Sequence, residues 1–335
     1  MTETMRTVLP TLPDDLRPAA RLLWERSRVI TNDVTETLLL SYKILREIKG
    51  SPGQLESGAD AFGRRVGDHL AAARSDIDDA YPILAEGWRG GGAEAFMDYV
   101  PRLSRAIESA QDSALHTVEA IAAFQASLSA LWAKVIERTQ QTGGEVITVI
   151  AEAGDYPLAA VAPVIEIVER FSQFVEQLAE SLMQLTSDTH AAGDRLRSAT
   201  LESLSPNGSG PRLPEPGENA VAPSGWTPAH TAVELDTAAM ARMTSALDDA
   251  GEHWDKAAEH SADIAREQLT PEAFGLAGTH FWDDLHGVLD RDRELYGAAD
   301  NQVSGLAKTL RRIGAEYAEA DDAAATELRR GLEDT

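Results

Sequence analysis

The stretch AEGWRGGGAEAF, from Ala85 to Phe96, decides how this chain folds. It separates two segments in which apolar residues recur three and four positions apart, which is the spacing of helices that bury one face. Its glycines allow the backbone conformations of a tight reversal, and Trp88 has the size to cover the end of a hairpin core. The stretch therefore predicts a turn between two long helices that pack against each other.

The composition excludes several classes of function. The chain has 335 residues, of which 43% are hydrophobic, so a folded core is expected. It contains no cysteine, which excludes disulfides, thiol catalysis and thiolate zinc sites. With 30 basic residues against 55 acidic ones, the net charge is −25. This charge disfavours binding to nucleic acid or to an anionic membrane surface.

The sequence predicts neither a secretory signal peptide nor an integral membrane segment. The N-terminus lacks a basic region followed by an apolar one. The most apolar stretch, 146–168, is interrupted by prolines and acidic residues, namely Glu152, Asp155, Pro157, Pro163 and Glu166. Because a membrane-spanning helix needs roughly 20 nearly uncharged apolar residues, this stretch predicts two packed helix ends around a turn.

The remaining pattern predicts an all-α fold, a bundle of long helices. Ala, Leu, Glu, Asp and Arg dominate, and strict alternation of apolar and polar residues is absent. Pro101 lies inside the third helical pattern, which predicts a kink or a fresh helix start there. The helices expected in the N-terminal domain, 1–204, cover about 16–49, 55–85, 93–142 and 158–204.

A Pro- and Gly-rich linker, 205–228, is predicted to separate this domain from a C-terminal helical hairpin, 229–335. The hairpin is expected to contain a helix over about 236–268, a turn over 270–281 and one last long helix. Two helices alone cannot close a core, so their apolar stripes must face another hairpin, in this chain or in a partner. The sequence therefore predicts that the chain functions by association with another helical hairpin.

The N-terminal hairpin, about 54–142, resembles the WXG100 superfamily, the small helical-hairpin proteins exported by type VII (ESX) secretion systems. The resemblance rests on a helix, then Trp88-Arg-Gly90, then small residues, then a new helix that opens with Ala93 and Phe96. It implies a WXG100-like hairpin in which the elbow Trp88-x-Gly90 forms part of an export signal.

The C-terminal domain is similar to the ESX secretion-associated proteins of actinobacteria, another group of WXG100-like hairpins. The similarity rests on VELDTAAMARMTSALDDAGEHWDKAA, on FGLAGTHF and on YAEADDAAATEL, near the end of the chain. In this hairpin the usual Trp-x-Gly is replaced, because Phe274, Gly275 and Gly278 form the turn and Trp282 is followed by two aspartates.

These families carry a secretion signal of the form Tyr-x-x-x-Asp/Glu after the second helix of the hairpin. Tyr317 and Asp321 match it, and residues four apart share one face of a helix. Tyr296 and Asp300 match it as well. Position favours the pair Tyr317 and Asp321, which lies near the C-terminal end of the last helix.

The resemblance implies a substrate or secretion-associated partner of a type VII system, secreted without a signal peptide or held in the cytoplasm before export. In paired WXG100 proteins the elbow of one hairpin lies beside the Tyr-x-x-x-Asp of the other. We expect the same composite signal here, with Trp88 and Gly90 close to Tyr317 and Asp321 through intramolecular pairing of the two hairpins. The expected partners are a type VII secretion ATPase or another WXG100-like protein. The alternatives are a membrane-acting helical toxin component and a cytoplasmic adaptor for an exported toxin.

No spacing of residues demands an enzyme, a cofactor or a metal. His253 and His260 are seven residues apart, about 10.5 Å along a helix, which is too far to share one ion. His280, Asp283 and Asp284 stand where acidic residues favour the start of a helix. Phosphate-binding loops, nucleophile elbows and zinc-protease motifs are absent. The sequence therefore predicts a protein that is not an enzyme.

Overall fold

The computed structural model describes residues 7–12, 14, 16–27, 32–48, 50–154, 156–204 and 234–333. The predicted linker, 205–228, lies outside these residues. By compactness the chain divides into two units, each assembled from three segments: Met1–Ala59, Glu119–Arg195 and Arg266–Leu285 in the first, and Asp60–Val118, Leu196–Ala265 and His286–Thr335 in the second. The sequence domains 1–204, 205–228 and 229–335 stay a prediction.

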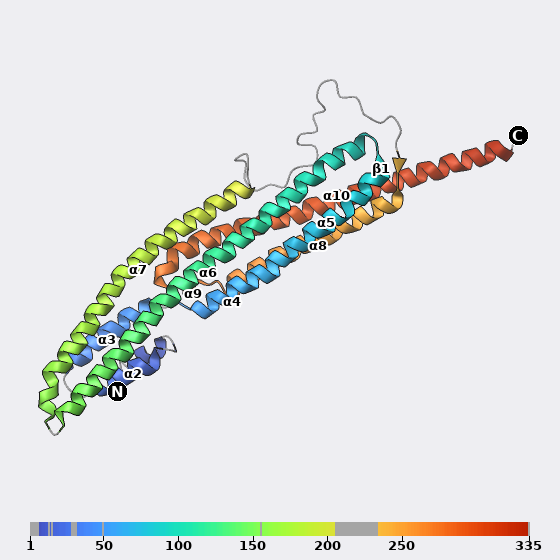
Figure 1. Ribbon diagram of the computed structural model, residues 1–335. Coiled ribbons are helices and arrows are strands. Elements are labelled where there is room, and N and C mark those ends of the chain that lie inside the picture. The colour runs from blue at the N-terminus through green and yellow to red at the C-terminus, as the bar shows by residue number, and fades with distance from the viewer. Residues whose placement is uncertain are drawn as a thin grey trace. The chain divides into compact units, whose positions relative to one another are not determined.

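The second unit contains the elbow at Trp88 and the start of the helix that follows the predicted linker. It contains α5 (Asp68–Gly87), β1 (Trp88–Arg89), β2 (Glu234–Leu235) and the larger parts of α8 (Thr237–Glu267) and α10 (Thr279–Glu333). The first part of α6 (Gly91–Ala153) also belongs to it, and Figure 1 shows α5 leading into α6 through β1.

Four helices of the second unit pack on one another. The Tyr81 hydroxyl on α5 donates to the Met97 carbonyl on α6 over 3.2 Å. The Gln302 amide on α10 donates to the Tyr99 hydroxyl on α6 over 3.3 Å. Trp254 on α8 and Tyr296 on α10 are both fully buried, with ring centroids 5.5 Å apart. Helices from both predicted hairpins therefore contribute to one packed bundle.

The first unit contains shorter helices around the remaining parts of the long ones. Its elements are η1 (Leu9–Thr11), α2 (Arg17–Ser27), α3 (Asn32–Glu47), most of α4 (Pro52–Phe62), η3 (Pro157–Ala160), most of α7 (Val161–Leu204), α9 (Pro271–Phe274) and η4 (Leu276–Gly278). Tyr42 on α3 shows how they pack, since its ring lies 6.3 Å from that of Phe171 on α7. Its hydroxyl donates to the Ala20 carbonyl on α2 over 3.0 Å.

Three of the expected helices differ from those observed. The single helix expected over 16–49 is wrong, because α2 ends at Ser27 and α3 begins at Asn32. The helix expected over 93–142 continues to Ala153 as α6. The helix expected over 55–85 is present as α4 and α5 joined by a π-helical turn, η2 (Gly63–Gly67). A π turn inserts an extra residue into the helical ladder, and hydrophobic spacing alone does not reveal it.

The fresh helix start expected at Pro101 is also wrong, because α6 runs unbroken from Gly91 to Ala153. Proline removes a single helical hydrogen bond. Val100 and Leu103, on either side of it, are buried, so packing holds the helix together through that position.

The all-α fold class predicted from the sequence is confirmed. Apart from the two-residue strands β1 and β2, the regular elements of the described ranges are helices. None of the helices in those ranges combines the length and the apolar character needed to cross a membrane.

Candidate functional site

The elbow after α5 is a short antiparallel strand pair and not a free loop. Trp88 pairs with Leu235, and Arg89 pairs with Glu234. Gly90 follows with φ of 124°, a conformation that residues with a side chain rarely adopt. Its carbonyl accepts the Glu94 amide over 3.0 Å as α6 begins. The reversal thus depends on Gly90, and β2 fixes its position, since Trp88 pairs with Leu235, 147 residues further along the chain (235 − 88).

Trp88 itself is buried, with 6% of its surface exposed. Its ring centroid lies 5.8 Å from that of Phe96 on α6. A Cβ added at Gly92 would stand 3.4 Å from the same indole, so the start of α6 lies against it. Trp88 therefore covers the end of the α5–α6 hairpin, and a partner that recognises this elbow in the folded chain meets mainly its backbone and its neighbours.

The elbow is attached directly to the first turn of α8. The Asp236 amide donates to the Gly87 carbonyl over 2.6 Å, and a Cβ added at Gly87 would stand 2.8 Å from the Asp236 Cβ. The Asp236 carboxylate accepts the amides of Ala238 and Ala239 over 2.8 and 3.2 Å. Asp236 is thus the N-terminal cap of α8, and it stands where the two hairpins meet.

Tyr317 lies on α10, where its side chain is half-buried. Asp321 lies on the same helix, and its side chain is outside the described residues. One turn before Tyr317, a Cβ added at Gly314 would meet the Met240 side chain on α8 at 3.4 Å. The turn of α10 that precedes Tyr317 therefore approaches the first turns of α8, the same part of α8 that holds the elbow.

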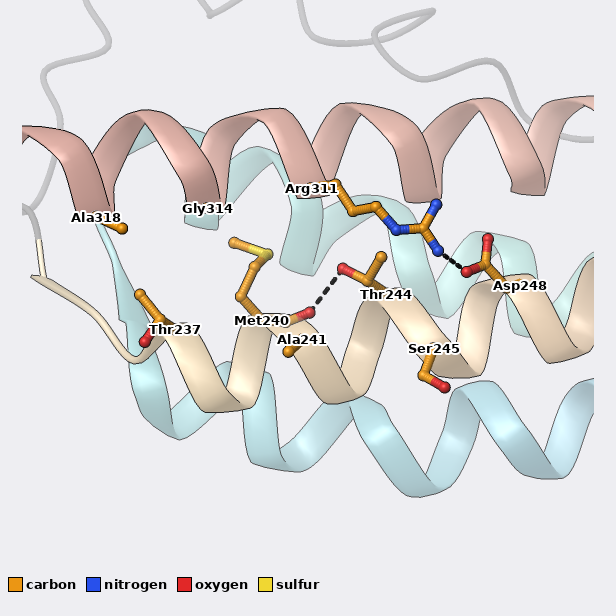
Figure 2. Close-up of a pocket in the computed structure, with 9 residues that line it drawn as sticks. All are labelled: Thr237, Met240, Ala241, Thr244, Ser245, Asp248, Arg311, Gly314 and Ala318. Atoms are coloured by element: carbon orange, nitrogen blue, oxygen red, sulfur yellow. Dashed lines mark hydrogen bonds and ion pairs between the residues drawn. The ribbon is translucent and has the colours of Figure 1, made fainter.

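A shallow groove of about 330 Å³ separates α8 from α10 at this place. Figure 2 shows the Met240 side chain rising from α8 toward Gly314, while Arg311 reaches down to an ion pair with Asp248. The residues that line the groove are Thr237, Met240, Ala241, Thr244, Ser245, Asp248, Arg311, Gly314 and Ala318. Small side chains leave the groove open, and Ala318 follows Tyr317 directly.

The rival tyrosine, Tyr296, lies in the core of the second unit with no exposed surface. Asp300, its partner in the alternative motif, accepts the Ser304 hydroxyl over 3.2 Å. A tyrosine with no exposed surface cannot be contacted by another protein while the chain is folded. Of the two motifs, the one with Tyr317 is the accessible one.

In the turn of the second hairpin, Phe274 and Gly278 are buried. Phe274 has no exposed surface, and its ring stacks on Phe124 of α6 at 5.5 Å. Gly275 has φ of 64°. A Cβ added at Gly278 would stand 2.6 Å from the Phe124 ring and 2.7 Å from the Phe274 Cβ, so only glycine fits there. This turn is a packing element of the first unit, and its backbone carbonyl at Ala273 accepts the Ser51 amide over 2.8 Å.

A cluster of three histidines joins α5 to α8. Two of them, His253 and His260, were considered in the sequence analysis, and the third, His69, was not. His69 lies between His253 and His260, with its Nδ1 2.9 Å from the Nδ1 of His253. Its ring is stacked on that of His260, with centroids 5.4 Å apart. Burial and the neighbouring imidazoles lower the pKa of His69. His69 stands 184 residues from His253, so no local spacing could have pointed to it.

The sequence pattern also did not indicate the buried carboxyl group of Asp292. Asp292 has no exposed surface, and it accepts the Ser113 hydroxyl over 3.4 Å. Its second oxygen lacks a hydrogen-bond partner among the described residues, as does the hydroxyl of Tyr296 one turn further on. Burial raises the pKa of Asp292 to about 7, because a charged carboxylate is costly away from water.

Comparison with protein-family models, with curated proteins and with solved structures finds no match for this chain.

Proposed function

We propose that this chain is a non-enzymatic substrate of a type VII (ESX) secretion system, or a protein that accompanies such a substrate, acting through helix-bundle contacts. The observation that carries the proposal is the arrangement around the first turns of α8. Trp88 and Arg89 of the elbow pair with the two residues of β2, just before α8, and the turn of α10 before Tyr317 approaches Met240. The elbow and the turn of α10 before Tyr317 thus both approach the start of α8, and this supports the proposal of a composite signal.

In this proposal each motif has a distinct physical role. Trp88 is buried, so it sets the shape of the elbow and does not itself contact the receptor. Tyr317 is half-buried, and its neighbour Ala318 lines the groove. A receptor that reads both would require the folded chain, since unfolding separates residues that are 229 positions apart (317 − 88).

The two hairpins of the chain take the place of two separate proteins in this proposal. In paired secretion substrates one hairpin covers the apolar stripe of the other, and here contacts such as Tyr99 with Gln302 and Trp254 with Tyr296 serve that purpose within one polypeptide. The proposed partner is then the secretion ATPase or a further WXG100-like protein.

Export of Tyr317→Ala tests the assignment of the signal. We expect the variant to fold as the parent does, because Tyr317 is only half-buried. We expect it to be lost from the culture medium of an actinobacterium that exports the parent chain. Tyr296→Phe is the matched control, since it removes a buried hydroxyl that has no hydrogen-bond partner in the described part of the chain and should leave export unchanged. If both variants reach the medium as the parent does, Tyr317 is not part of a signal.

The cytoplasmic adaptor remains the competing proposal, and the same cultures separate the two. A parent chain that stays inside the cell while it binds an exported protein would identify an adaptor. Capture of the chain with a tagged secretion ATPase, in the presence and absence of the Tyr317→Ala change, then shows whether the motif is used inside the cell.

A further inference from the structure

Three histidines, His69, His253 and His260, meet where α5 packs on α8, and the proposed function does not use them. Their side chains are half-buried, so water and protons reach them. Because α5 leads into the elbow of the first predicted hairpin and α8 begins the second, a contact here bears on how the two hairpins hold together. Their chemistry can be measured on the purified chain and does not depend on whether the chain is exported.

A single proton satisfies the closest pair of these imidazoles. The Nδ1 atoms of His69 and His253 lie 2.9 Å apart, which is a hydrogen-bond distance. A hydrogen bond between two imidazole nitrogens needs a proton on one nitrogen and a lone pair on the other. The pair is therefore satisfied when both rings are neutral or when one of them is charged. When both rings are charged, two N–H groups point at each other and no lone pair is left between them.

His260 adds a third imidazole to this contact. Its ring is stacked on that of His69, with centroids 5.4 Å apart, and the centroids of His69 and His253 are 5.2 Å apart. His69 thus has a ring on each side that can take up a proton. Because like charges at this spacing repel each other, a charge on His69 works against the packing of α5 on α8 whenever a neighbouring ring is charged.

The charged groups around the cluster come from the same two helices. Those that act electrostatically on the histidines or on Asp76 are Asp68, Asp76 and Asp79 on α5 and Asp249, Glu252 and Lys256 on α8. Asp76 Oδ2 lies 3.6 Å from His253 Nε2, so this carboxylate attracts a charge on His253. Burial and the cationic neighbours of His69 outweigh the carboxylate of Asp68 and lower the pKa of His69.

We propose that His69, His253 and His260 form an acid-sensitive contact between α5 and α8, which is closed while His69 is neutral and opens when His69 takes up a proton from water. In the closed state one proton lies between the Nδ1 atoms of His69 and His253. In the open state both Nδ1 atoms carry protons, and each N–H group donates to water. Acid therefore loosens the attachment of α5 to α8.

The direction of the effect follows from the lowered pKa of His69. Opening exposes this side chain to water, where the pKa of a histidine is about 6.5. Below that pH the open state binds a proton that the closed state lacks, so the contact weakens as pH falls and has its full strength at higher pH. Asp292 acts in the opposite direction, because acid relieves the cost of its buried charge. A test must therefore compare chains that all retain Asp292.

Hydrogen exchange of the full chain at pH 7.5 and at pH 5.0, corrected for intrinsic exchange rates, measures this contact. The probes are the backbone amides of α5 and α8 around His69 and His253. His69→Gln keeps a side chain that can bond to the Nδ1 of His253, and it takes up no proton. We expect the protection of the parent, relative to His69→Gln, to fall about tenfold between the two pH values, the effect of one proton taken up over one pH unit.

His116→Gln is the matched control, because His116 is an exposed histidine on α6 in the same unit. It should lose protection as the parent does. Side-chain NMR of the parent gives a readout that needs no variant, since His69 should become charged below about pH 6.5 and together with the loss of protection. A ratio of parent to His69→Gln that is the same at both pH values, or a His69 that becomes charged at or above about pH 6.5, would overturn the proposal.

Discussion

At the scale of single residues, the buried carboxyl of Asp292 makes the stability of the chain depend on pH. Its pKa is about 7 in the folded chain, against 3.8 as the ordinary value. Between these pH values the folded state keeps a proton that the unfolded state has released, so the group lowers stability as pH rises from 4 to 7. The full penalty is about 4 kcal/mol and is constant at higher pH.

Asp292→Asn removes this titration and keeps an oxygen that can accept the Ser113 hydroxyl. We expect the variant to be more stable than the parent at pH 8 by up to about 4 kcal/mol, and nearly equal to it at pH 4. Urea unfolding of both chains across this range measures the difference. Asp112→Asn, at an exposed position on α6, is the control. A variant that is less stable than the parent at pH 8 would show that Asp292 is ionised and well paired.

Gly90 is the second residue whose replacement has a defined cost. With φ of 124°, Gly90→Ala forces a side chain into a conformation that costs about 1–3 kcal/mol. Gly144→Ala is the opposite case, because this glycine lies exposed inside α6 with nothing within 4 Å of the added Cβ. That change should raise stability by about 0.5–1 kcal/mol. Thermal unfolding compares the two, and equal midpoints for both variants would contradict the observed elbow.

At the scale of elements, the start of α8 depends on one cap. Asp236 accepts the amides of Ala238 and Ala239, so Asp236→Ala should cost about 1 kcal/mol, while Asp236→Asn keeps an accepting oxygen and should cost less. Hydrogen exchange of the Ala238 and Ala239 amides reports the loss directly. Unchanged protection in the alanine variant would mean that the strand pair alone fixes this end of the helix.

The turn between α8 and α10 is held by its aromatic residues. Phe274 has no exposed surface and contacts Phe124 and Phe281, so Phe274→Ala should destabilise the first unit by about 3–5 kcal/mol. Leu276, two residues later and 65% exposed, is the control, because its replacement by alanine creates no cavity. Denaturant unfolding measures the free energy of unfolding of both variants. A similar decrease for Phe274→Ala and Leu276→Ala would contradict this packing.

The sequence predicted these elements to the extent that local spacing determines them. The stripes of α6 and α10 repeat over many turns, and the glycines around Trp88 and after Phe274 mark both turns. The break between α2 and α3 and the π turn at Gly63–Gly67 carry no such mark. The strand pair of Trp88 with Leu235 and the contact of His69 with His253 join distant parts of the chain, so only tertiary structure reveals them.

At the scale of the whole molecule, the central claim is that a type VII system handles this chain through its elbow and Tyr317. The most direct test compares culture filtrates of an actinobacterium with and without its type VII secretion ATPase, both expressing the parent chain. The account predicts the chain in the filtrate of the first strain and its retention in the cells of the second. Equal amounts in both filtrates, with a cytoplasmic marker absent from each, would contradict it.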